Sequence, residues 1–436
     1  MTVYFYTLGC KVNQYETRAM MAAVRAAGMQ ADTFSAGFSA AGDYALVINS
    51  CTVTAEADRK LRQLLRRCRR DNPGAVIALT GCMPQAYPET AERYTEADIV
   101  LGNTARGRLP AYIRQFQTLG RRVVDILPHG EAFESPGELR AFEGRTRAYI
   151  KIEDGCDRFC SYCIVPYARG RVRSRPLAEI RAEAETLAAA GYTEVVLVGI
   201  NLTAYGSEIN HSFTLADAVE QAAAAEGIRR IRLGSLEPDQ MDGRLLDRLA
   251  AQPKLCPQFH LSLQSGCDAT LRRMNRRYTA ADYAGLADRL RRRFPGCALT
   301  TDVMVGFPGE TREEFAESLD FVKKTGFSRA HIFPYSRRPG TPAAAAKDQV
   351  SAAEKAARAG EMAAAAETGR AAYEETFIGR NAEVLVEIVR PGGECEGFNA
   401  HYLPVRFYGE TANMRGQTVR VRITGRSGDF LIGERL

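Results

Sequence analysis

The chain has 436 residues, of which 45% are hydrophobic and 25% are charged, and its formal net charge is +6. This composition predicts a globular protein with room for two or three domains and excludes a chain that is mainly disordered. No apolar run approaches the roughly 18 residues of a membrane span, and the start MTVYFYTLGC lacks the basic beginning and long apolar stretch of a signal peptide. We therefore expect a cytoplasmic protein with no membrane partner.

Strand-like and helical stretches alternate from residue 1 to 125, which predicts a small parallel sheet. Strands are expected over 3–9, 45–50, 76–81 and 99–103. The clearest helices are expected over 55–70 and over 14–27, where Gly28 ends the helix. Residues 126–146 mix proline and glycine with charged residues, so they are expected to form a linker.

The same alternation returns with longer units between residues 147 and 342. Gly191 and Gly326 stand where helices should end, and Thr311 with Glu314 forms a capping box for a helix over 312–325. Six parallel strands with crossover helices predict an open or partial (βα)6 barrel, whose functional groups lie at the carboxyl ends of the strands. The strands are expected over 149–154, 195–200, 231–236, 259–264, 299–307 and 330–336.

The last part of the chain changes character. Residues 343–379 are rich in alanine and predict a helical connector, whereas 380–436 contain short β runs and predict a small β-barrel. Its strands are expected over 382–389, 404–409 and 418–425. The predicted class is therefore α/β, with a parallel-sheet domain (1–125), a linker (126–146), a partial barrel (147–342), a connector (343–379) and a β-barrel (380–436).

The strongest chemical signal is the stretch EDGCDRFCSYCIVPYARGR (153–171), directly after a predicted strand. Cys156, Cys160 and Cys163 have C-x3-C-x2-C spacing, and three thiolates close together suit an iron–sulfur cluster. The alternative is zinc, but a structural zinc site needs four ligands and no fourth Cys or His lies nearby in sequence. Three cysteines on a four-iron cluster leave one iron open to bind a small molecule through amino and carboxylate groups.

Three further cysteines each follow a predicted strand of the first domain: Cys10, Cys51 and Cys82. The carboxyl ends of parallel strands share one edge, so these thiols can meet and hold a second three-cysteine cluster. The alternative is that each is an ordinary buried cysteine. Asn13 and Asn49 either hydrogen-bond this site or cap turns.

The cysteine loop, with Tyr162 before its third cysteine, resembles the signature of the radical S-adenosylmethionine (SAM) superfamily. With TLGCKVNQYE (7–16), INSCTVT (48–54), TGCMPQ (80–85) and GFNAHYLPVRF (397–407), the whole chain resembles the methylthiotransferases. These radical SAM enzymes have an amino-terminal auxiliary-cluster domain and a small RNA-binding barrel of the TRAM type. The resemblance implies S-adenosyl-L-methionine and two 4Fe-4S clusters as cofactors. Cys156, Cys160 and Cys163 would ligate the radical cluster and Cys10, Cys51 and Cys82 the auxiliary cluster, all six being catalytic.

The resemblance also implies how the reaction proceeds. One SAM methylates a sulfur on the auxiliary cluster, and a second yields the 5′-deoxyadenosyl radical that lets the methylsulfide replace an unreactive ring hydrogen. Four residues are expected to contact SAM, and the motif GFPGE (306–310) resembles the one near its adenine; for each, a turn or a satisfied polar residue is the alternative. The four residues are Tyr162, Gly199, Glu237 and Gln264.

The motif around the first cysteine bears on the substrate. Family members modify an isopentenyl- or threonylcarbamoyl-adenosine beside the anticodon, or an aspartate of a ribosomal protein. GCKVNQYE differs from the GCQMN and GCPKN openings and resembles the threonylcarbamoyl type, as do INSCTVT and HIFPYSRRPGTPA (331–343). The expected function is methylthiolation of carbon 2 of threonylcarbamoyladenosine at position 37 of tRNA. The alternatives are the isopentenyl substrate, a radical methyltransferase without an auxiliary cluster, and a non-enzymatic iron–sulfur sensor that binds RNA.

Basic segments are expected to contact the tRNA anticodon loop: RKLRQLLRRCRRD (59–71), the arm YARGRVRSR (167–175) with Arg169, Arg171 and Arg173, and the tail residues Arg420 and Arg422 with Phe398, Tyr402 and Tyr408. The alternatives are a solvated helix face and a tail of nearly balanced charge. A flavodoxin- or ferredoxin-type electron donor and a monomeric state are also expected. The remaining cysteines and the histidines have no ligand-like spacing: Cys68, Cys256, Cys267, Cys297, Cys395, His129, His211, His260, His331 and His401.

Overall fold

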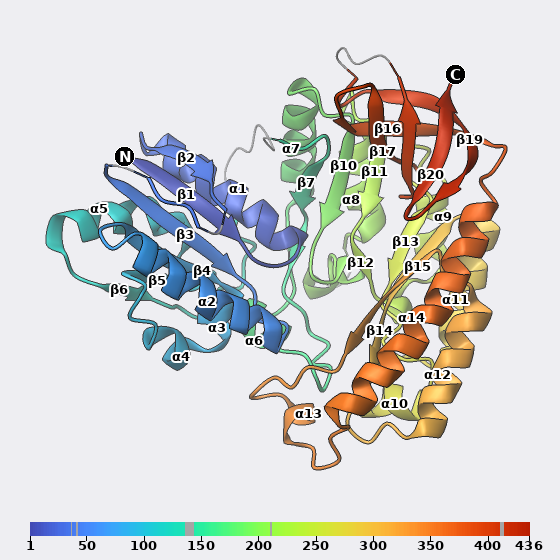
Figure 1. The fold of residues 1–436 in the computed structure, drawn as a ribbon, viewed down its shortest axis with the longest axis horizontal. Coiled ribbons are helices and arrows are strands. Elements are labelled where there is room, and N and C mark those ends of the chain that lie inside the picture. Colours follow the sequence, from blue (N-terminus) through green and yellow to red (C-terminus); the bar gives the residue numbers. More distant parts are fainter. Residues whose placement is uncertain (36, 41, 136–143, 210–211, 410–413) are drawn as a thin grey trace. The chain divides into compact units, whose positions relative to one another are not determined.

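The computed structural model describes residues 1–35, 37–40, 42–135, 144–209, 212–409 and 414–436 (Figure 1). These residues form two compact units. The first unit comprises 1–135, 151–175 and 336–345, and the second comprises 144–150, 176–335 and 346–436. The cysteine loop therefore packs with the amino-terminal sheet. The domain boundaries predicted from sequence stay a prediction, and His211 and part of the expected linker lie outside the described residues.

The first unit is built on a parallel sheet with two covered faces. Its elements are β1 (Thr2–Thr7), α1 (Lys11–Ala26), β2 (Gln30–Thr33), β3 (Tyr44–Ser50), α2 (Ala55–Asp71), β4 (Val76–Gly81), α3 (Cys82–Ala86), α4 (Pro88–Glu92), β5 (Ile99–Leu101), a 3-10 turn (Arg106–Arg108), α5 (Leu109–Leu119) and β6 (Val123–Asp125). The strand order is β2-β1-β3-β4-β5-β6. Side chains of α1 and α5 pack on one face, and those of α2 and α3 pack on the other. The four predicted strands are confirmed, and the short edge strands β2 and β6 are additional.

Four short elements complete the first unit: β8 (Glu153–Asp154), α6 (Val165–Arg169), β9 (Arg173–Ser174) and α13 (Pro342–Ala345). Strands β8 and β9 pair antiparallel, so the cysteine loop starts and ends at the same place. The backbone N–H of Cys156 donates to the carbonyl of Gly170 at 3.0 Å. Gly155 has φ +88°, and a Cβ there would lie 1.8 Å from the carbonyl oxygen of Arg171, so this loop closure requires glycine.

The second unit contains the predicted partial barrel. Its elements are β7 (Ala148–Lys151, whose last residue belongs to the first unit), α7 (Leu177–Ala189), β10 (Glu194–Val198), α8 (Leu215–Ala223), β11 (Arg230–Leu233), β12 (Ser235–Leu236), α9 (Gly243–Ala250), β13 (Gln258–Leu261), α10 (Asp268–Arg273), α11 (Ala280–Arg293), β14 (Ala298–Val305), α12 (Arg312–Thr325), β15 (Arg329–Pro334) and α14 (Ala352–Glu375), with 3-10 turns at Leu202–Ala204, Ser207–Ile209 and Pro238–Gln240. The sheets are β11-β10-β7 and β12-β13-β14-β15. Only Gly234 separates β11 from β12, so six strand positions follow one another in chain order. This confirms the expected partial barrel.

Local signals in the barrel act as the sequence predicts. The Thr311 hydroxyl accepts from the N–H of Glu314 at 3.2 Å, while the Glu314 carboxylate accepts from the N–H of Thr311 at 3.1 Å. Gly326 ends α12 in the left-handed conformation with φ +64°. Helix α14 packs against α12 and β15, so the predicted connector covers the sheet (Figure 1).

The carboxyl-terminal part of the second unit is a closed barrel of β16 (Asn381–Val389), β17 (Glu394–Asn399), β18 (Pro404–Tyr408), β19 (Thr418–Ser427) and β20 (Phe430–Arg435), in the order β16-β17-β18-β20-β19. Its core is filled by side chains such as Val384, Val405 and Phe407. The sequence did not reveal β17 and β20. Gly397 and Gly433 interrupt their apolar pattern, because a Cβ at either position would lie within 2.4 Å of a neighbouring strand.

None of the helices in the described part of the chain combines the length and apolar composition needed to cross a bilayer.

Candidate metal centres

The structure brings Cys10, Cys51 and Cys82 to one edge of the first sheet. Cys10 caps the start of α1, Cys51 follows β3 directly, and Cys82 is the first residue of α3 after β4. Strands β1, β3 and β4 are parallel neighbours, and their register pairs Thr7 with Asn49 and Asn49 with Thr80. The three thiols therefore emerge at adjacent strand ends, as the spacing of the strands predicted.

A buried amide network supports this edge. The Nδ2 of Asn13 donates to the carbonyl of Ser50 at 2.9 Å, and the Nδ2 of Asn49 donates to the carbonyl of Asn13 at 2.9 Å. The Sγ of Cys10 donates to the Oδ1 of Asn13 at 3.3 Å. Of the two roles left open for Asn13 and Asn49, the structure favours support of the cysteine site.

Two glycines allow the strand ends to approach each other. Gly81 has φ +103°, and a Cβ there would lie 2.4 Å from the carbonyl oxygen of Ser50. Gly9 has φ +119°, and its Cβ would lie 2.9 Å from the Cβ of Cys51. Any side chain at Gly9 or Gly81 would push apart the segments that carry the cysteines.

The three thiols interact electrostatically. Burial, together with the charges of Cys82 and Cys10, raises the pKa of Cys51 to about 12. Burial likewise raises the pKa of Cys82. Among the described residues, no three His, Cys, Asp or Glu side chains lie close enough to hold one metal ion. A four-iron cluster is larger than one ion, and its positive iron atoms offset the thiolate repulsion, so the donor set fits such a cluster.

The second cysteine set lies in the loop between β8 and α6. The N–H of Cys163 donates to the carbonyl of Cys160 at 2.9 Å. Phe159 has φ +48°, unusual for a bulky residue, and its ring packs edge-on against Tyr167 at 5.9 Å. Burial raises the pKa of Cys156 to about 12, with further contributions from the charges of Cys163, Glu153 and Cys160. This loop also presents three mutually repelling thiols and fits a three-thiolate cluster.

A distant segment fixes the cysteine loop in place. The N–H of Ala343 donates to the carbonyl of Ser161, between two of the cysteines, at 2.8 Å. In the same segment the guanidinium of Arg338 pairs with Asp58, and the carbonyl of Pro339 accepts from the Tyr87 hydroxyl at 3.0 Å. Residues 336–345 thus belong to the cysteine-bearing unit, although their sequence carries no metal-ligand pattern.

The arm YARGRVRSR differs from its predicted role as an RNA contact. Arg169 and Arg173 are buried, with 1% and 6% of their surface exposed, so neither is available to phosphate. Only Arg171 of the three predicted residues points to solvent, with 73% of its side chain exposed. The correction has a local cause: Arg169 is the last residue of helix α6, the chain turns at Gly170, and only Arg173 lies on β9 where it pairs with β8, so the three arginines do not share the one face that a single strand would give them.

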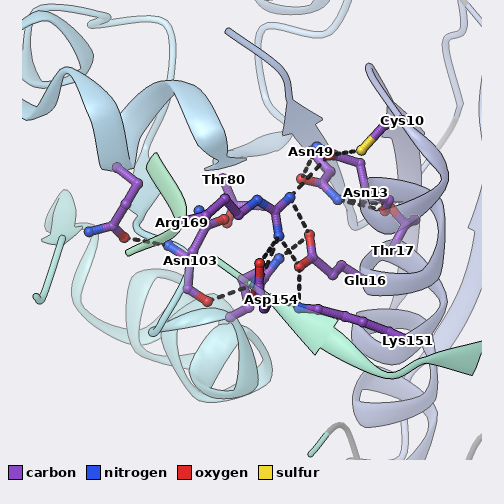
Figure 2. Close-up of polar contacts among 12 residues, drawn as sticks. Cys10, Asn13, Glu16, Thr17, Asn49, Thr80, Asn103, Lys151, Asp154 and Arg169 are labelled. Carbon is purple, nitrogen blue, oxygen red and sulfur yellow. Dashed lines mark hydrogen bonds and ion pairs between the residues drawn. The ribbon is translucent and has the colours of Figure 1, made fainter. Parts of the chain in front are cut away.

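Arg169 occupies the centre of a buried charged group in the first unit, as Figure 2 shows. Its guanidinium contacts both carboxylate oxygens of Glu16, at 3.0 Å for the longer contact, and lies 3.5 Å from Asp154. It also donates to the Oδ1 of Asn13 at 3.1 Å and interacts with the Cys82 thiol. Sequence reasoning missed Glu16 and Asp154, because a single carboxylate on a helix or strand gives no signal of its tertiary partner.

Further cations complete this charged group. The Nζ of Lys151 lies 2.9 Å from Glu16 and 2.6 Å from Asp154, Arg106 pairs with Glu16, and Arg173 lies 3.6 Å from Asp154. A cavity of about 380 Å³ borders Glu16, Arg106 and Lys151. It leaves room for water on one side of these charges.

The expected SAM-contacting residues of the second unit lie after strands of the partial barrel. Gly199 follows β10, and Glu237 follows β12 and pairs with Arg276. Gln264 has φ +65°, and its buried Oε1 has no hydrogen-bond partner. A buried acceptor held in a strained conformation is typical of a ligand site. Tyr162 lies in the first unit, half-buried in the cysteine loop, and the Glu310 carboxylate of GFPGE accepts from Gly306 N–H and Arg358.

A second cavity, of about 640 Å³, lies beside the loops that follow β10 and β12 and the starts of α8 and α9. Thr203, Gln240 and Arg244 are among the residues that line it. None of Gly199, Glu237 and Gln264 lines this cavity, so it is separate from the expected SAM contacts.

The tail residues divide into an exposed set and an internal set. Arg420 and Arg422 lie on β19 and are exposed, and Tyr408 is 69% exposed. Tyr402 instead stacks on Phe398 at 4.8 Å, and Arg147 lies 4.8 Å from both rings. Phe398 and Tyr402 therefore fix the barrel to its own unit, which corrects their predicted role as free stacking surfaces.

The other cysteines are unpaired in the structure and buried: Cys68, Cys256, Cys267, Cys297 and Cys395. His260 lies 3.3 Å from Asp302, and His129 contacts the carbonyl of Ala168 at 3.1 Å. No described histidine joins a group able to hold a metal ion.

Comparison with known protein families and solved structures identifies the class of enzyme. Residues 150–322 match the Radical SAM superfamily, and residues 2–102 match a family described as Uncharacterized protein family UPF0004. Two solved structures share the fold: the radical S-adenosylmethionine methyltransferase TsrM from Kitasatospora setae (TM-score 0.58, 17% identity, 79% of this chain and 74% of that chain) and the cobalamin-dependent S-adenosylmethionine radical enzyme OxsB (TM-score 0.54, 12% identity, 78% and 54%). The chain is therefore a radical SAM enzyme, and this class implies a 4Fe-4S cluster and SAM.

Relatives that align with nearly the whole length of the chain identify its family within this class. The chain is 38% identical to the threonylcarbamoyladenosine tRNA methylthiotransferase MtaB of Bacillus subtilis, over 97% of this chain and 93% of the relative. It is 35% identical to the MtaB of Thermotoga maritima, over 99% and 96%. It is also 35% identical to the tRNA-2-methylthio-N(6)-dimethylallyladenosine synthase of Maricaulis maris, over 99% and 96%. The chain belongs to the radical SAM methylthiotransferases, as the sequence predicted.

Proposed function

We propose that this enzyme methylthiolates carbon 2 of threonylcarbamoyladenosine at position 37 of tRNA, using two 4Fe-4S clusters. One observation carries the proposal: two three-cysteine sites lie in the same compact unit, one at three adjacent strand ends and one in the radical SAM loop. A radical methyltransferase without an auxiliary cluster has no use for the first site. The motif around Cys10 favours the threonylcarbamoyl substrate. Two relatives that align with nearly the full length of the chain carry the name of threonylcarbamoyladenosine tRNA methylthiotransferase, which supports the same substrate.

The residues have separate roles in this proposal. Cys156, Cys160 and Cys163 would hold the radical SAM cluster, and Cys10, Cys51 and Cys82 the auxiliary cluster. When bound, the clusters and SAM supply the one-electron chemistry that replaces the C–H bond, for which no acid or base in the chain is suited. The chain itself positions the groups and limits water: Gly9 and Gly81 let the strand ends approach, and Asn13 and Asn49 hold them in register.

The second unit would supply the SAM site. The orphan Oε1 of Gln264 can accept a hydrogen bond from the SAM amino or hydroxyl groups. Gly199 leaves a strand end open to the cofactor, and Glu237 is oriented by its pair with Arg276. Tyr162, in the cysteine loop, stays a predicted SAM contact.

Contacts with tRNA would come from exposed cations. Arg171 on the cysteine arm and Arg420 and Arg422 on the terminal barrel are exposed and suited to phosphate, and Tyr408 offers an exposed ring. The electron donor of flavodoxin or ferredoxin type, the monomeric state and the cytoplasmic location stay predictions.

The substrate is tested by mass spectrometry of tRNA nucleosides from cells that lack the gene. We expect 2-methylthio-threonylcarbamoyladenosine to disappear while its isopentenyl counterpart stays unchanged, and the intact gene to restore it. Loss of the isopentenyl product instead would overturn the substrate assignment in favour of the dimethylallyl type seen in the Maricaulis maris relative.

The clusters are tested by iron analysis of the anaerobically reconstituted chain. We expect roughly eight irons per chain, and about half of them after Cys10, Cys51 and Cys82 are all changed to Ala. About four irons in the unchanged chain would contradict the second cluster. Failure of the reduced protein to form 5′-deoxyadenosine from SAM would favour the non-enzymatic sensor.

A further inference from the structure

The buried charged group of the first unit carries more positive than negative charge. Within the described residues, its ion pairs join four cations to two carboxylates, which leaves a net charge of +2 at neutral pH. Burying unpaired charge is costly in a protein interior, so an excess of this kind indicates that an anion belongs nearby. The carboxylates are Glu16 and Asp154, and the cations are Arg106, Lys151, Arg169 and Arg173.

Arg169 brings this positive charge to the cysteines at the strand ends. Its guanidinium interacts electrostatically with the Cys82 thiol. It also donates to the Oδ1 of Asn13 at 3.1 Å, and the same oxygen lies 3.3 Å from the Sγ of Cys10. Arg169 therefore reaches Cys10 through the side-chain amide of Asn13 and acts on Cys82 through its charge.

Arg169 is held rigidly for this task. Glu16 on α1 binds it through both carboxylate oxygens, and Asp154 on β8 lies 3.5 Å away (Figure 2). The arginine itself stands at the end of α6, six residues after Cys163 in the chain. One side chain from the radical SAM arm is thus fixed against the auxiliary cysteines. Glu153 is a buried carboxylate on the side of Cys156, where it acts on the other cysteine set.

A four-iron cluster held by three thiolates is negatively charged, and it gains a further negative charge when it accepts an electron. A fixed cation nearby stabilises the reduced form more than the oxidised form, and Arg169, with 1% of its surface exposed, is weakly screened by solvent. We propose that Arg169, held by Glu16 and Asp154, is a positioning residue that keeps an excess positive charge against the auxiliary cluster and raises its reduction potential. This inference rests on the auxiliary cluster of the proposed function.

The test uses the full chain with Cys156, Cys160 and Cys163 changed to Ala, so that only the auxiliary cluster can assemble. Dithionite supplies one electron per cluster in a mediated titration, and the EPR signal of the reduced cluster reports the potential. Into this background we introduce R169Q, R169K and E16Q separately. R59Q is the matched control, because Arg59 is an ion-paired arginine of the same unit whose side chain is 51% exposed and therefore screened by solvent.

The R169Q and E16Q variants are expected to shift the reduction potential of the auxiliary cluster in opposite directions. R169Q removes a positive charge and lowers the potential, whereas E16Q removes a negative charge and raises it. R169K keeps the charge and shifts the potential less than R169Q, and R59Q leaves it unchanged. A role in folding alone gives no such reversal of sign, because both R169Q and E16Q break the same buried pair.

Each remaining outcome has a defined meaning. Potentials of R169Q and E16Q that move together, or that both stay at the background value, overturn the inference. Where R169Q does not fold, the rise expected for E16Q still decides the question. A background that holds about four irons but shows no shift overturns this inference alone, whereas a background without iron overturns the auxiliary cluster of the proposed function as well.

Discussion

The two units each bury a group of arginines and carboxylates, but the two groups differ in charge balance. In the second unit Arg147, Arg230 and Arg232 surround the buried Glu194, and the partly buried Glu387 and the exposed Glu383 complete the pairs at the edge of the group. Cations and carboxylates are thus equal in number there, whereas four cations meet two carboxylates in the first unit.

The partners of the two groups differ as well. Arg232 donates to Glu194 at 2.7 Å and to the carbonyl oxygens of Asn399 and Ala400 at 2.6 and 2.8 Å, so it ties the terminal barrel to the sheet of β10 and β11. Arg169 instead contacts side chains that surround candidate metal ligands. A balanced group fastens parts of a fold together, whereas an unbalanced group beside thiols is suited to hold an anion.

The largest expected effect is a difference in enzyme activity between variants of the two cysteines that interact with these arginines. Cys82 interacts with Arg169, and Cys256 interacts with Arg232. We expect Cys82→Ala to reduce the methylthio product to background, because the auxiliary cluster loses one of three protein ligands, while 5′-deoxyadenosine formation continues. Cys256→Ala should keep both the product and the iron content. Product analysis and iron analysis measure the difference, and equal losses in the two variants would contradict the comparison.

The next effect concerns stability of the second unit. Arg232→Met leaves Glu194 buried with one partner fewer, and breaking such a pair costs about 3–5 kcal/mol of unfolding free energy. Urea unfolding followed by circular dichroism measures the loss. Arg181→Met is the matched control, because Arg181 forms an exposed pair with Glu185 and its removal should cost at most about 0.5 kcal/mol. Similar costs for both arginines would show that the Arg232 group does not hold the barrel in place.

A smaller effect depends on pH. Burial, together with the charges of Arg232, Arg380 and Arg230, lowers the pKa of His401 to about 4. The unfolded chain takes up this proton at a higher pH than the folded chain does, so stability is full above about pH 6.5 and falls as the pH drops towards 4. Between pH 7.5 and pH 4.5, the His401→Gln variant should therefore lose roughly 2 kcal/mol less unfolding free energy than the unchanged protein. The measurement is the melting temperature of the unchanged protein and of the variant at experimental pH settings of 7.5, 5.5 and 4.5. If the melting temperatures of the two proteins fall equally as the pH drops, His401 is not a neutral buried side chain.

The smallest effect concerns RNA contacts at the exposed face of the terminal barrel. Arg420→Gln and Arg422→Gln should each weaken tRNA binding a few-fold and reduce the slope of log affinity against log salt by about 1, because each removes one phosphate contact. Filter binding over a salt series gives the slopes, with Arg181→Gln as the control. Unchanged slopes for both variants would remove β19 from the RNA-binding surface.

Much of the fold follows from local patterns. The apolar strands β3 and β4, the capping box at Thr311 and the glycine stop at Gly326 are encoded within a few residues each, so they could be predicted. Edge strand β6 and barrel strands β17 and β20 could not, because they are short or interrupted by glycines that only close strand contact explains.

The sequence by itself determined the chemistry: six cysteines at two kinds of spacing, placed after strands whose parallel ends must share an edge. Only the tertiary structure decided where the charges act. Arg169, Arg171 and Arg173 look alike in YARGRVRSR, yet two turn inward to Glu16 and Asp154 and one faces solvent. Charge pattern reports the number of cations, whereas their burial and partners depend on contacts between residues more than a hundred positions apart, such as Glu16 and Arg169.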